Sequence, residues 1–297
     1  MIPPPVPPES AYPALARPLL ELDEVVVEYP GSGRLKPGFR ALHGVSLSVA
    51  PGETLGLVGE SGSGKTTLGR AVLGLAPVTA GDIRYDGRSI AHLARRERRA
   101  LSKDIQVVFQ DPYTSLNPAM TVMDILTEPL LVTGVSRSAA EHRVQALLDQ
   151  VQLPEDAARR LPREFSGGQR QRIAIARALS RGPRLIVCDE PVSALDLSTQ
   201  ARVLDLFVQI QEATGVAYLF VTHDLAVVRH ISHRVAVLYR GEVVETGETT
   251  KVTDGPDHPY TRRLLLAAMV PDPDRQAQRR AERRRFAESQ AGKEPAA

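Results

Sequence analysis

The chain has 297 residues, enough for one large domain or two modest ones. Hydrophobic residues make up 42% of it, enough for a substantial core, and the formal net charge of +2 neither indicates nor excludes a polyanionic partner. The single cysteine, Cys188, excludes an internal disulfide and a Cys-rich metal or iron–sulfur site within this chain, and it favours a reducing, cytosolic compartment.

The two ends of the chain differ in composition from the rest. Residues 1–18 carry seven prolines, which predicts a disordered lead, and no basic stretch followed by an apolar one marks a secretory signal. Residues 271–297 are rich in Arg, Ala and Glu and predict a basic, disordered tail. No run approaches the roughly 18–20 consecutive apolar residues of a membrane span. We therefore expect one folded unit between about Leu19 and Val270.

Short β-branched runs alternate with helical patterns through this unit. Strands are predicted at Leu22–Tyr29, Val45–Val49, Thr54–Val58, Ile105–Phe109, Leu185–Asp189, Ala217–Thr222 and Arg234–Tyr239. Helices are predicted at Lys65–Leu75, Gly168–Ser180, Ser198–Ala213 and Leu225–Ile231. Several of the predicted strands are continuous apolar runs, which is typical of strands buried on both faces of a sheet. The alternation predicts an α/β fold with a mostly parallel sheet.

Residues 112–165 interrupt this alternation, because no convincing strand falls among them. Ser138 and Glu141 predict a capping box at the start of a helix. The apolar stripe of that helix comprises Ala140, Val144, Leu147, Leu148 and Val151. We expect a helical subdomain inserted between two strands of the sheet.

The strand at Thr54–Val58 is followed by a phosphate-binding loop. Residues 59–66 match G-x-x-x-x-G-K-[ST] without deviation, with a strand before and a helix after. Glycines let the backbone N–H groups point inward, Lys65 reaches the β- and γ-phosphates, and the Thr66 hydroxyl suits Mg²⁺. The predicted nucleotide-binding residues are Gly59, Glu60, Ser61, Gly62, Ser63, Gly64, Lys65, Thr66 and Thr67. A chance glycine-rich turn is the alternative, and the order of strand, loop and helix argues against it.

Two acids end the apolar strand at Leu185–Asp189. Asp189 falls at the carboxyl edge of the sheet, beside the predicted loop, where it can hold Mg²⁺ directly or through water. Glu190 follows and would face the γ-phosphate, where a carboxylate can polarise an attacking water. Simple solvation of two acids at a strand end is the alternative. Cys188 lies within the strand with no histidine predicted beside it, so we expect a small buried hydrophobic residue rather than a nucleophile.

A second anion site is predicted where Ser166, Gly167, Gly168 and Gln169 open a helix. The phosphate loop already serves its own nucleotide, so this second site suits a nucleotide held by another subunit. The chain resembles the ATPase subunit of an ABC transporter over roughly residues 20–270, with SGGQ as the signature motif. The resemblance implies a P-loop NTPase fold with an antiparallel β edge. Phe165 stands where the family usually has leucine.

The resemblance also implies roles for residues outside these motifs. Gln110 matches the Q-loop glutamine, which touches Mg²⁺ and water and links to the membrane subunits, so the implied metal ligands are Thr66, Gln110 and Asp189. Ser193, Ala194, Leu195 and Asp196 match the D-loop, which crosses the dimer interface. His223 matches the switch histidine and joins Glu190 and Gln110 as catalytic residues. A core histidine is the alternative for His223.

Tyr29 resembles the aromatic residue that stacks on adenine, with Phe39 as a competitor and ordinary strand packing as the alternative. For Arg170, Arg172 and Arg177 on the signature helix, a solvated helix face is a sufficient explanation.

Finer resemblances favour the peptide-importer branch, in its second ATPase subunit type. They are VFQDPYTSLNP, CDEPVSALDLSTQA and the HPYT motif at His258–Thr261, within a C-terminal segment of about residues 255–270. The implied cofactors are ATP and Mg²⁺. The implied partners are a second ABC ATPase subunit, two transmembrane permeases and an extracytoplasmic solute-binding protein, with no direct cargo contact by this chain. The implied location is peripheral, on the cytoplasmic face of the inner membrane.

Three other functions stay open. The same machinery is also found in importers of nickel or glutathione. A soluble ABC ATPase acting on nucleic acid would use the arginines of residues 279–285, although a solvated tail explains them and nucleic acid is not expected as a partner. A scaffold with an inactive phosphate loop conflicts with the presence of Gln110, Asp189, Glu190 and His223.

Overall fold

The computed structural model describes residues 17–31 and 38–267. Its strands are β1 (Leu20–Tyr29), β2 (Phe39–Val49), β3 (Thr54–Val58), β4 (Val78–Tyr85), β5 (Arg88–Ser89), β6 (Ile105–Val108), β7 (Leu185–Asp189), β8 (Ala217–Thr222), β9 (Arg234–Tyr239) and β10 (Glu242–Glu248). Its α-helices are α1 (Lys65–Val72), α2 (Arg95–Leu101), α3 (Pro112–Ser115), α4 (Val122–Leu131), α5 (Arg137–Gln150), α6 (Gly167–Leu179), α7 (Leu197–Thr214), α8 (Leu225–Ile231), α9 (Thr249–Asp254) and α10 (Pro259–Ala267). Two short 3₁₀ helices, η1 (Glu155–Arg159) and η2 (Pro162–Glu164), lie between α5 and α6.

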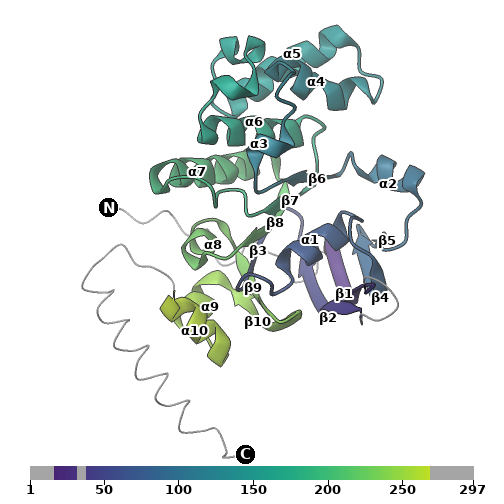
Figure 1. Ribbon diagram of the computed structural model, residues 1–297, viewed down its shortest axis with the longest axis vertical. Helices are drawn as coiled ribbons and strands as arrows, with labels where there is room; N and C mark the ends of the chain where they lie inside the picture. Colours follow the sequence, from purple (N-terminus) through teal and green to yellow (C-terminus); the bar gives the residue numbers. More distant parts are fainter. Residues whose placement is uncertain (1–16, 32–37, 268–297) are drawn as a thin grey trace, which may run out of the picture.

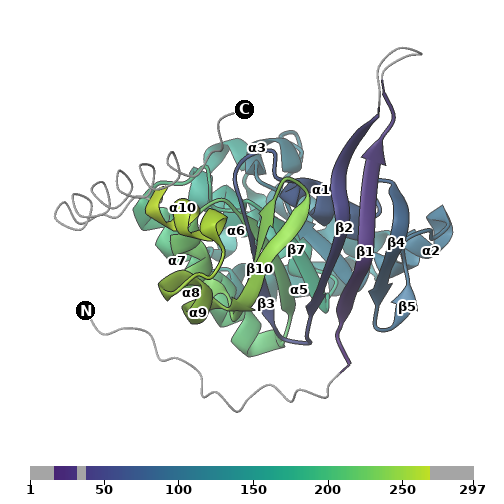
Figure 2. The ribbon, with the colours of Figure 1, turned by 90° about the horizontal axis from the view of Figure 1, so that it is seen from below.

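The strands form two sheets. A six-stranded sheet has the order β10-β9-β3-β8-β7-β6, and all of its neighbours pair in parallel except β10, which is antiparallel to β9. A four-stranded antiparallel sheet has the order β2-β1-β4-β5. Figure 2 shows β1, β2 and β4 side by side at one side of the molecule and α8, α9 and α10 at the opposite side. The predicted α/β fold with a mostly parallel sheet and an antiparallel edge is confirmed.

The central strands are buried on both faces, as is typical of a parallel sheet covered by helices. Every residue of β3 and β8 is buried, as their continuous apolar runs predict. One core joins β1, β2 and β3 to α1, while a second joins β7 and β8 to α6, α7 and the helical subdomain. A smaller third core lies under β9, α8 and α10. The sheet therefore separates the nucleotide-loop side from the helical side.

The helical insertion at residues 112–165 contains α3, α4, α5, η1 and η2 and no strand. Figure 1 shows α4 and α5 at the end of the molecule away from the antiparallel strands, with α3 and α6 between them and the sheet. The predicted capping box is wrong, because Ser136 caps α5 by accepting a hydrogen bond from the Ala139 N–H group. Ser138 lies inside the first turn. Both serines offer a hydroxyl three residues before a suitable donor, and only the backbone of Ser136 is extended, as a cap requires.

The sequence patterns missed β4, β5, β10, α2 and α9, and they placed the start of β2 six residues late. In β4, Gly81 and Asp82 interrupt the alternation of apolar and polar residues expected of a strand. Glycine is needed at position 81 because φ is 79° and a Cβ would lie 2.2 Å from the Glu24 carbonyl oxygen. Of the predicted lead at residues 1–18, residues 1–16 lie outside the described residues, as does the whole predicted tail at residues 271–297. Within the described part, no helix combines the length and the apolar composition that a bilayer crossing requires.

Candidate functional site

Four loops meet at one edge of the six-stranded sheet. The phosphate loop follows β3, Gln110 comes two residues after β6, Glu190 follows β7 and His223 follows β8. These strands run in parallel, so their carboxyl ends point to the same edge. Residues separated by more than 160 positions in sequence are thereby brought to one place, which is where ligands bind in open α/β sheets.

The phosphate loop curls between β3 and α1. Gly64 precedes α1 with φ 107°, and a Cβ there would lie 2.9 Å from the Ala41 carbonyl oxygen, so only glycine fits. The first intrahelical bond runs from the Leu68 N–H group to the Gly64 carbonyl oxygen. The N–H groups of Lys65, Thr66 and Thr67 therefore have no helical acceptor and remain available for an anion.

Lys65 is buried and points back into its own loop. Its Nζ donates to the carbonyl oxygens of Gly59 and Glu60, both at 2.8 Å. Burial lowers the pKa of Lys65, while the nearby carboxylates of Glu190, Asp189 and Glu60 oppose that shift. A cation held only by carbonyl oxygens in this way is poised to exchange them for phosphate oxygens.

Thr66 and Asp189 form the second element of the site. The Thr66 hydroxyl donates to Asp189 Oδ1 at 3.0 Å. Burial raises the pKa of Asp189, and the bond from Thr66 opposes the shift. Two hard oxygen atoms this close fit Mg²⁺, which usually takes one or two protein ligands and completes its shell with phosphate and water. Among the described residues, no group of three or more His, Cys, Asp or Glu side chains would hold a metal alone.

Glu190 is the centre of the third element. Its Oε2 lies 3.1 Å from His223 Nδ1 and accepts a hydrogen bond from Gln110 Nε2 at 3.4 Å. The Glu190 backbone has φ 48°, uncommon for a residue with a side chain, and its N–H group is fixed by the Val221 carbonyl oxygen of β8 at 3.0 Å. The side chain is 18% exposed, so water can reach the carboxylate. The carboxylate is thus accessible to water and has two polar neighbours, a geometry that a general base could use.

The signature residues form a helix cap at another place in the fold. Ser166 caps α6: its hydroxyl accepts from the Gln169 N–H group at 3.3 Å, and its N–H group donates to Gln169 Oε1 at 3.0 Å. These bonds join the signature residues to one another, and among those described none joins them to the phosphate loop. Gly168 is required for packing against α7, because a Cβ would lie 2.3 Å from Thr199 Cγ2.

In the predicted D-loop, Asp196 caps α7, and the bonds from Ser198 and Thr199 lower the pKa of its carboxyl group. Leu197, the next residue, is 78% exposed.

A family model described as "ABC transporter" matches residues 42–193, which spans the phosphate loop, Gln110, the signature residues and Glu190. The chain belongs to the ABC transporter family. It is 50% identical over 273 residues to the "Glutathione import ATP-binding protein GsiA" of Pectobacterium atrosepticum, covering 90% of this chain and 44% of that protein. It is 51% identical over 236 residues to the "Oligopeptide transport ATP-binding protein OppD" of Mycobacterium tuberculosis, covering 80% of this chain and 39% of that protein. The chain thus spans less than half the length of the curated relatives it matches.

Solved ABC cassettes share the fold. The ATP-binding cassette MJ0796, solved as a dimer in a post-hydrolysis state with ADP and Pi, is 31% identical with a TM-score of 0.69, covering 77% of this chain and 98% of that one. CbiO1 of Clostridium perfringens, described as part of the ABC transporter complex CbiONQ, is 26% identical with a TM-score of 0.72, covering 84% and 95%. The fold is that of an ABC ATPase cassette.

In this cassette the two candidate adenine-stacking residues lie opposite one another. Tyr29 ends β1 and pairs with Phe39, which begins β2. Tyr29 is half-buried against the core, whereas Phe39 is 66% exposed. Either ring can serve a base bound above this hairpin, so the assignment to Tyr29 stays a prediction.

The interpretation of the α6 arginines as a solvated face is wrong. Arg170 Nε donates to the Pro162 carbonyl oxygen at 2.8 Å, and its guanidinium lies 4.0 Å from the centroid of the Tyr113 ring. Arg172 Nη1 donates to the Val151 carbonyl oxygen at 3.2 Å, and Arg177 Nη1 to that of Ser115 at 2.8 Å. Their acceptors are backbone carbonyl groups of η2, of the residue after α5 and of the last residue of α3, so no helical periodicity predicts them. These arginines tie the signature helix to the helical subdomain.

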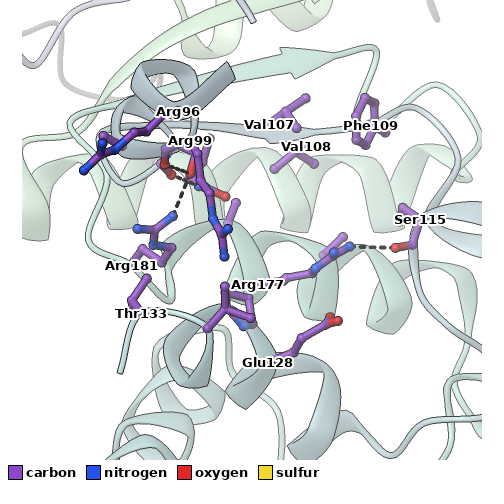
Figure 3. A pocket seen from close by; sticks show the side chains of 17 residues that line it. Arg96, Arg99, Val107, Val108, Phe109, Ser115, Glu128, Thr133, Arg177 and Arg181 are labelled. Carbon is purple, nitrogen blue, oxygen red and sulfur yellow. Dashed lines mark hydrogen bonds between the residues drawn. The ribbon is translucent and has the colours of Figure 1, made fainter. Parts of the chain in front are cut away.

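A cavity of about 670 Å³ lies between β6, α2, α4 and α6, and none of the phosphate-loop residues lines it. Figure 3 shows Arg96 and Arg99 of α2 on one side of it, with Arg177 and Arg181 from α6 and the turn that follows. Glu128 is the only acidic residue among those that line it. Phe109, the residue before Gln110, lies at its edge and is 41% exposed. The cavity is therefore positively charged and adjoins the Gln110 loop.

Proposed function

We propose that this chain is the ATP-hydrolysing subunit of a membrane ABC importer that takes up peptides. The observation that carries the proposal is the arrangement at the sheet edge. Glu190 contacts both His223 and Gln110, while Asp189, the preceding residue, bonds Thr66 of the phosphate loop. A candidate base, a candidate metal pair and a phosphate grip are therefore adjacent.

In the proposed reaction, water attacks the γ-phosphorus in line with the bond to the leaving ADP oxygen. Glu190 orients that water and accepts its proton, and His223 contacts the γ-phosphate while holding Glu190 through the bond between Nδ1 and Oε2. Lys65 exchanges its loop carbonyl oxygens for the β- and γ-phosphates. Thr66, Asp189 and Gln110 would hold Mg²⁺, which supplies charge neutralisation on the phosphates when it is bound.

The proposal includes a second ATPase subunit. Ser166–Gln169 form a helix start at which the N–H groups of Gly167 and Gly168 have no helical acceptor, and their described bonds do not reach the phosphate loop of the same chain. The binding site for a nucleotide on this loop would be completed by the signature residues of a partner subunit, with the D-loop at the interface between the two subunits. The neighbour solved as a dimer with ADP and Pi supports this arrangement.

Peptide cargo, permeases and a solute-binding protein are proposed from the relatives. These relatives are named "Glutathione import" and "Oligopeptide transport" ATP-binding proteins, and glutathione is itself a short peptide. We place the permease contact at the arginine-lined cavity beside Phe109, which suits a segment carrying apolar and acidic side chains. The chain would then lie peripherally on the cytoplasmic face of the membrane.

The catalytic assignment is tested with Glu190→Gln. The variant should bind ATP and accumulate as a closed dimer with hydrolysis reduced by about a hundredfold or more, since the base is lost while the amide keeps its shape. Glu212→Gln, an exposed change on α7, is the matched control. Hydrolysis by Glu190→Gln at the parent rate would show that another group is the base. Activity that persists without Mg²⁺ would refute the metal assignment.

The cargo assignment is tested in vesicles carrying the chain with its partner ATPase, permeases and solute-binding protein. Uptake of a labelled di- or oligopeptide should depend on ATP and be competed by unlabelled peptide. Uptake of glutathione without other peptides, or of Ni²⁺, would replace the proposed cargo while leaving the ATPase assignment intact.

A further inference from the structure

A tyrosine from the last described helix reaches the phosphate loop. Tyr260 lies on α10, 200 residues from Glu60, and its hydroxyl accepts a hydrogen bond of 2.9 Å from the Glu60 N–H group. Glu60 is the second residue of the loop. The C-terminal segment therefore contacts the nucleotide site through a single hydroxyl.

This bond and the Lys65 bond hold opposite sides of one peptide group. The carbonyl oxygen of Gly59 accepts from Lys65 Nζ, and the N–H group that shares its peptide plane is the one bound to Tyr260. Because a trans peptide is planar, its C=O and N–H point in opposite directions and two such bonds fix its rotation. The peptide between Gly59 and Glu60 is thus clamped from inside and outside the loop.

The hydroxyl itself is firmly placed. Tyr260 is 2% exposed and packs in a small core with Val58, the last residue of β3, while its ring centroid lies 4.2 Å from that of Tyr239. The turn before α10 is held by the Glu245 carboxylate of β10, which accepts from the N–H groups of Asp257 at 2.8 Å and His258 at 3.1 Å. Burial raises the pKa of Tyr260, so the hydroxyl is neutral at physiological pH.

We propose that Tyr260 is a positioning residue for the phosphate loop and sets its affinity for ATP. The inference rests on the proposed ATPase function. When Lys65 turns to the phosphates, the peptide group between Gly59 and Glu60 loses its inner partner. The hydrogen bond from the Glu60 N–H group to the Tyr260 hydroxyl then keeps this peptide group in the binding orientation. It also keeps in place the inward N–H groups that follow.

The test compares Tyr260→Phe with Tyr239→Phe. The first variant removes the hydroxyl and keeps the ring. The second removes the hydroxyl of the neighbouring tilted ring, for which no hydrogen bond is described. Tyr260→Phe should raise the Kd and KM for ATP roughly three- to tenfold, as expected for one lost hydrogen bond, with kcat at saturating ATP changed less than about twofold. Tyr239→Phe should match the parent. A fall in kcat at unchanged KM would overturn the proposal.

Amide exchange supplies readouts that do not depend on turnover. In nucleotide-free protein, Tyr260→Phe should speed exchange of the Glu60 amide by roughly the same factor, and Tyr239→Phe should not. In the parent, binding of a non-hydrolysable ATP analogue should slow exchange along α10, since coupling between two sites is reciprocal. This second measurement needs no variant, so it also decides the matter where Tyr260→Phe folds poorly.

The possible outcomes distinguish failure of the proposed ATPase function from failure of the positioning role of Tyr260. A parent chain that binds no ATP would refute the proposed function and the positioning role with it. A parent that binds and hydrolyses ATP, together with Tyr260→Phe behaving as Tyr239→Phe does, or with α10 unprotected by the analogue, would refute the positioning role alone.

Discussion

Replacing Asp189 with asparagine should stabilise the nucleotide-free protein while strongly reducing its ATPase activity. Burial is the main cause that raises the pKa of Asp189 above 3.8, ahead of the opposing bond from Thr66 and the charges of Arg70 and Lys65. The folded state therefore holds a proton at Asp189 more readily than the unfolded chain does. The stability from this proton is present below pH 3.8 and is lost as pH rises through the raised pKa. At neutral pH the charged carboxylate is a net cost to folding.

Asparagine removes that charge and keeps an oxygen that accepts the Thr66 bond. Relieving one unfavourable charge commonly adds about 0.5–2 kcal/mol of stability, and because solvent screens this half-buried side chain we expect a gain of about 1 kcal/mol. For a domain of this size that gain raises Tm by about 2–4 °C at pH 8 and vanishes toward acidic pH. ATP hydrolysis should fall by about two orders of magnitude, because a charged candidate metal ligand is lost.

The assay is thermal unfolding of the parent and Asp189→Asn between about pH 3.5 and pH 8, a range that includes the unfolded-state pKa of 3.8, without nucleotide. Asp149→Asn, on the exposed face of α5, removes the same charge at a solvated position and should leave Tm within about 1 °C of the parent. A lower Tm for Asp189→Asn at pH 8, or a gain that does not change with pH, would refute the argument that burial of the charge is what costs stability.

Three further predictions concern the signature helix and the cavity. Gly168→Ala should impair ATP-dependent dimerisation and hydrolysis, because its methyl group collides with Thr199 Cγ2, and adding Thr199→Ser, which deletes that methyl, should restore both in a sedimentation and phosphate-release assay. Failure of the rescue would show that the collision is not the cause. Arg177→Gln should lower the free energy of unfolding by about 1–2 kcal/mol in urea, through loss of its bond to the Ser115 carbonyl oxygen, whereas the exposed Arg143→Gln should not. Val132→Asp, at a 60% exposed position lining the cavity, should leave basal ATPase activity unchanged and reduce permease-dependent transport; unchanged transport would argue against docking there.

The sequence predicted the candidate site well because its parts lie at the ends of buried parallel strands. Apolar runs locate β3, β6, β7 and β8 with little ambiguity, and parallel pairing then places the residues that follow them at one edge. The contacts among Gln110, Glu190 and His223 follow from that geometry. Strand order was not needed to expect them, although it explains why β8, lying between β3 and β7, brings His223 to Glu190.

What the sequence did not predict depends on long-range packing. The strand β4 is interrupted by Gly81, whose conformation makes sense only against the bulge of β1 at Glu24. The arginines of α6 read as a solvated stripe because their acceptors are backbone carbonyl groups, which leave no trace in residue type. The same holds for Tyr260, whose partner is a backbone N–H group. Side chain to backbone contacts across the fold are invisible to motif and periodicity.

The two halves of the proposed nucleotide site are mechanically connected through the helical subdomain. Arg170 and Arg177 bind α6, and so the signature residues, to the 3₁₀ turn at η2 and to α3. The segment from β6 to α3 carries Phe109 at the cavity edge and Gln110 against Glu190. A permease segment bound in the cavity would therefore contact the segment whose Gln110 bonds Glu190. It would also contact α6, the helix that presents Ser166 to a partner subunit. On this reasoning neither half of the site responds alone, and hydrolysis should depend on dimer closure rather than on nucleotide binding by one chain.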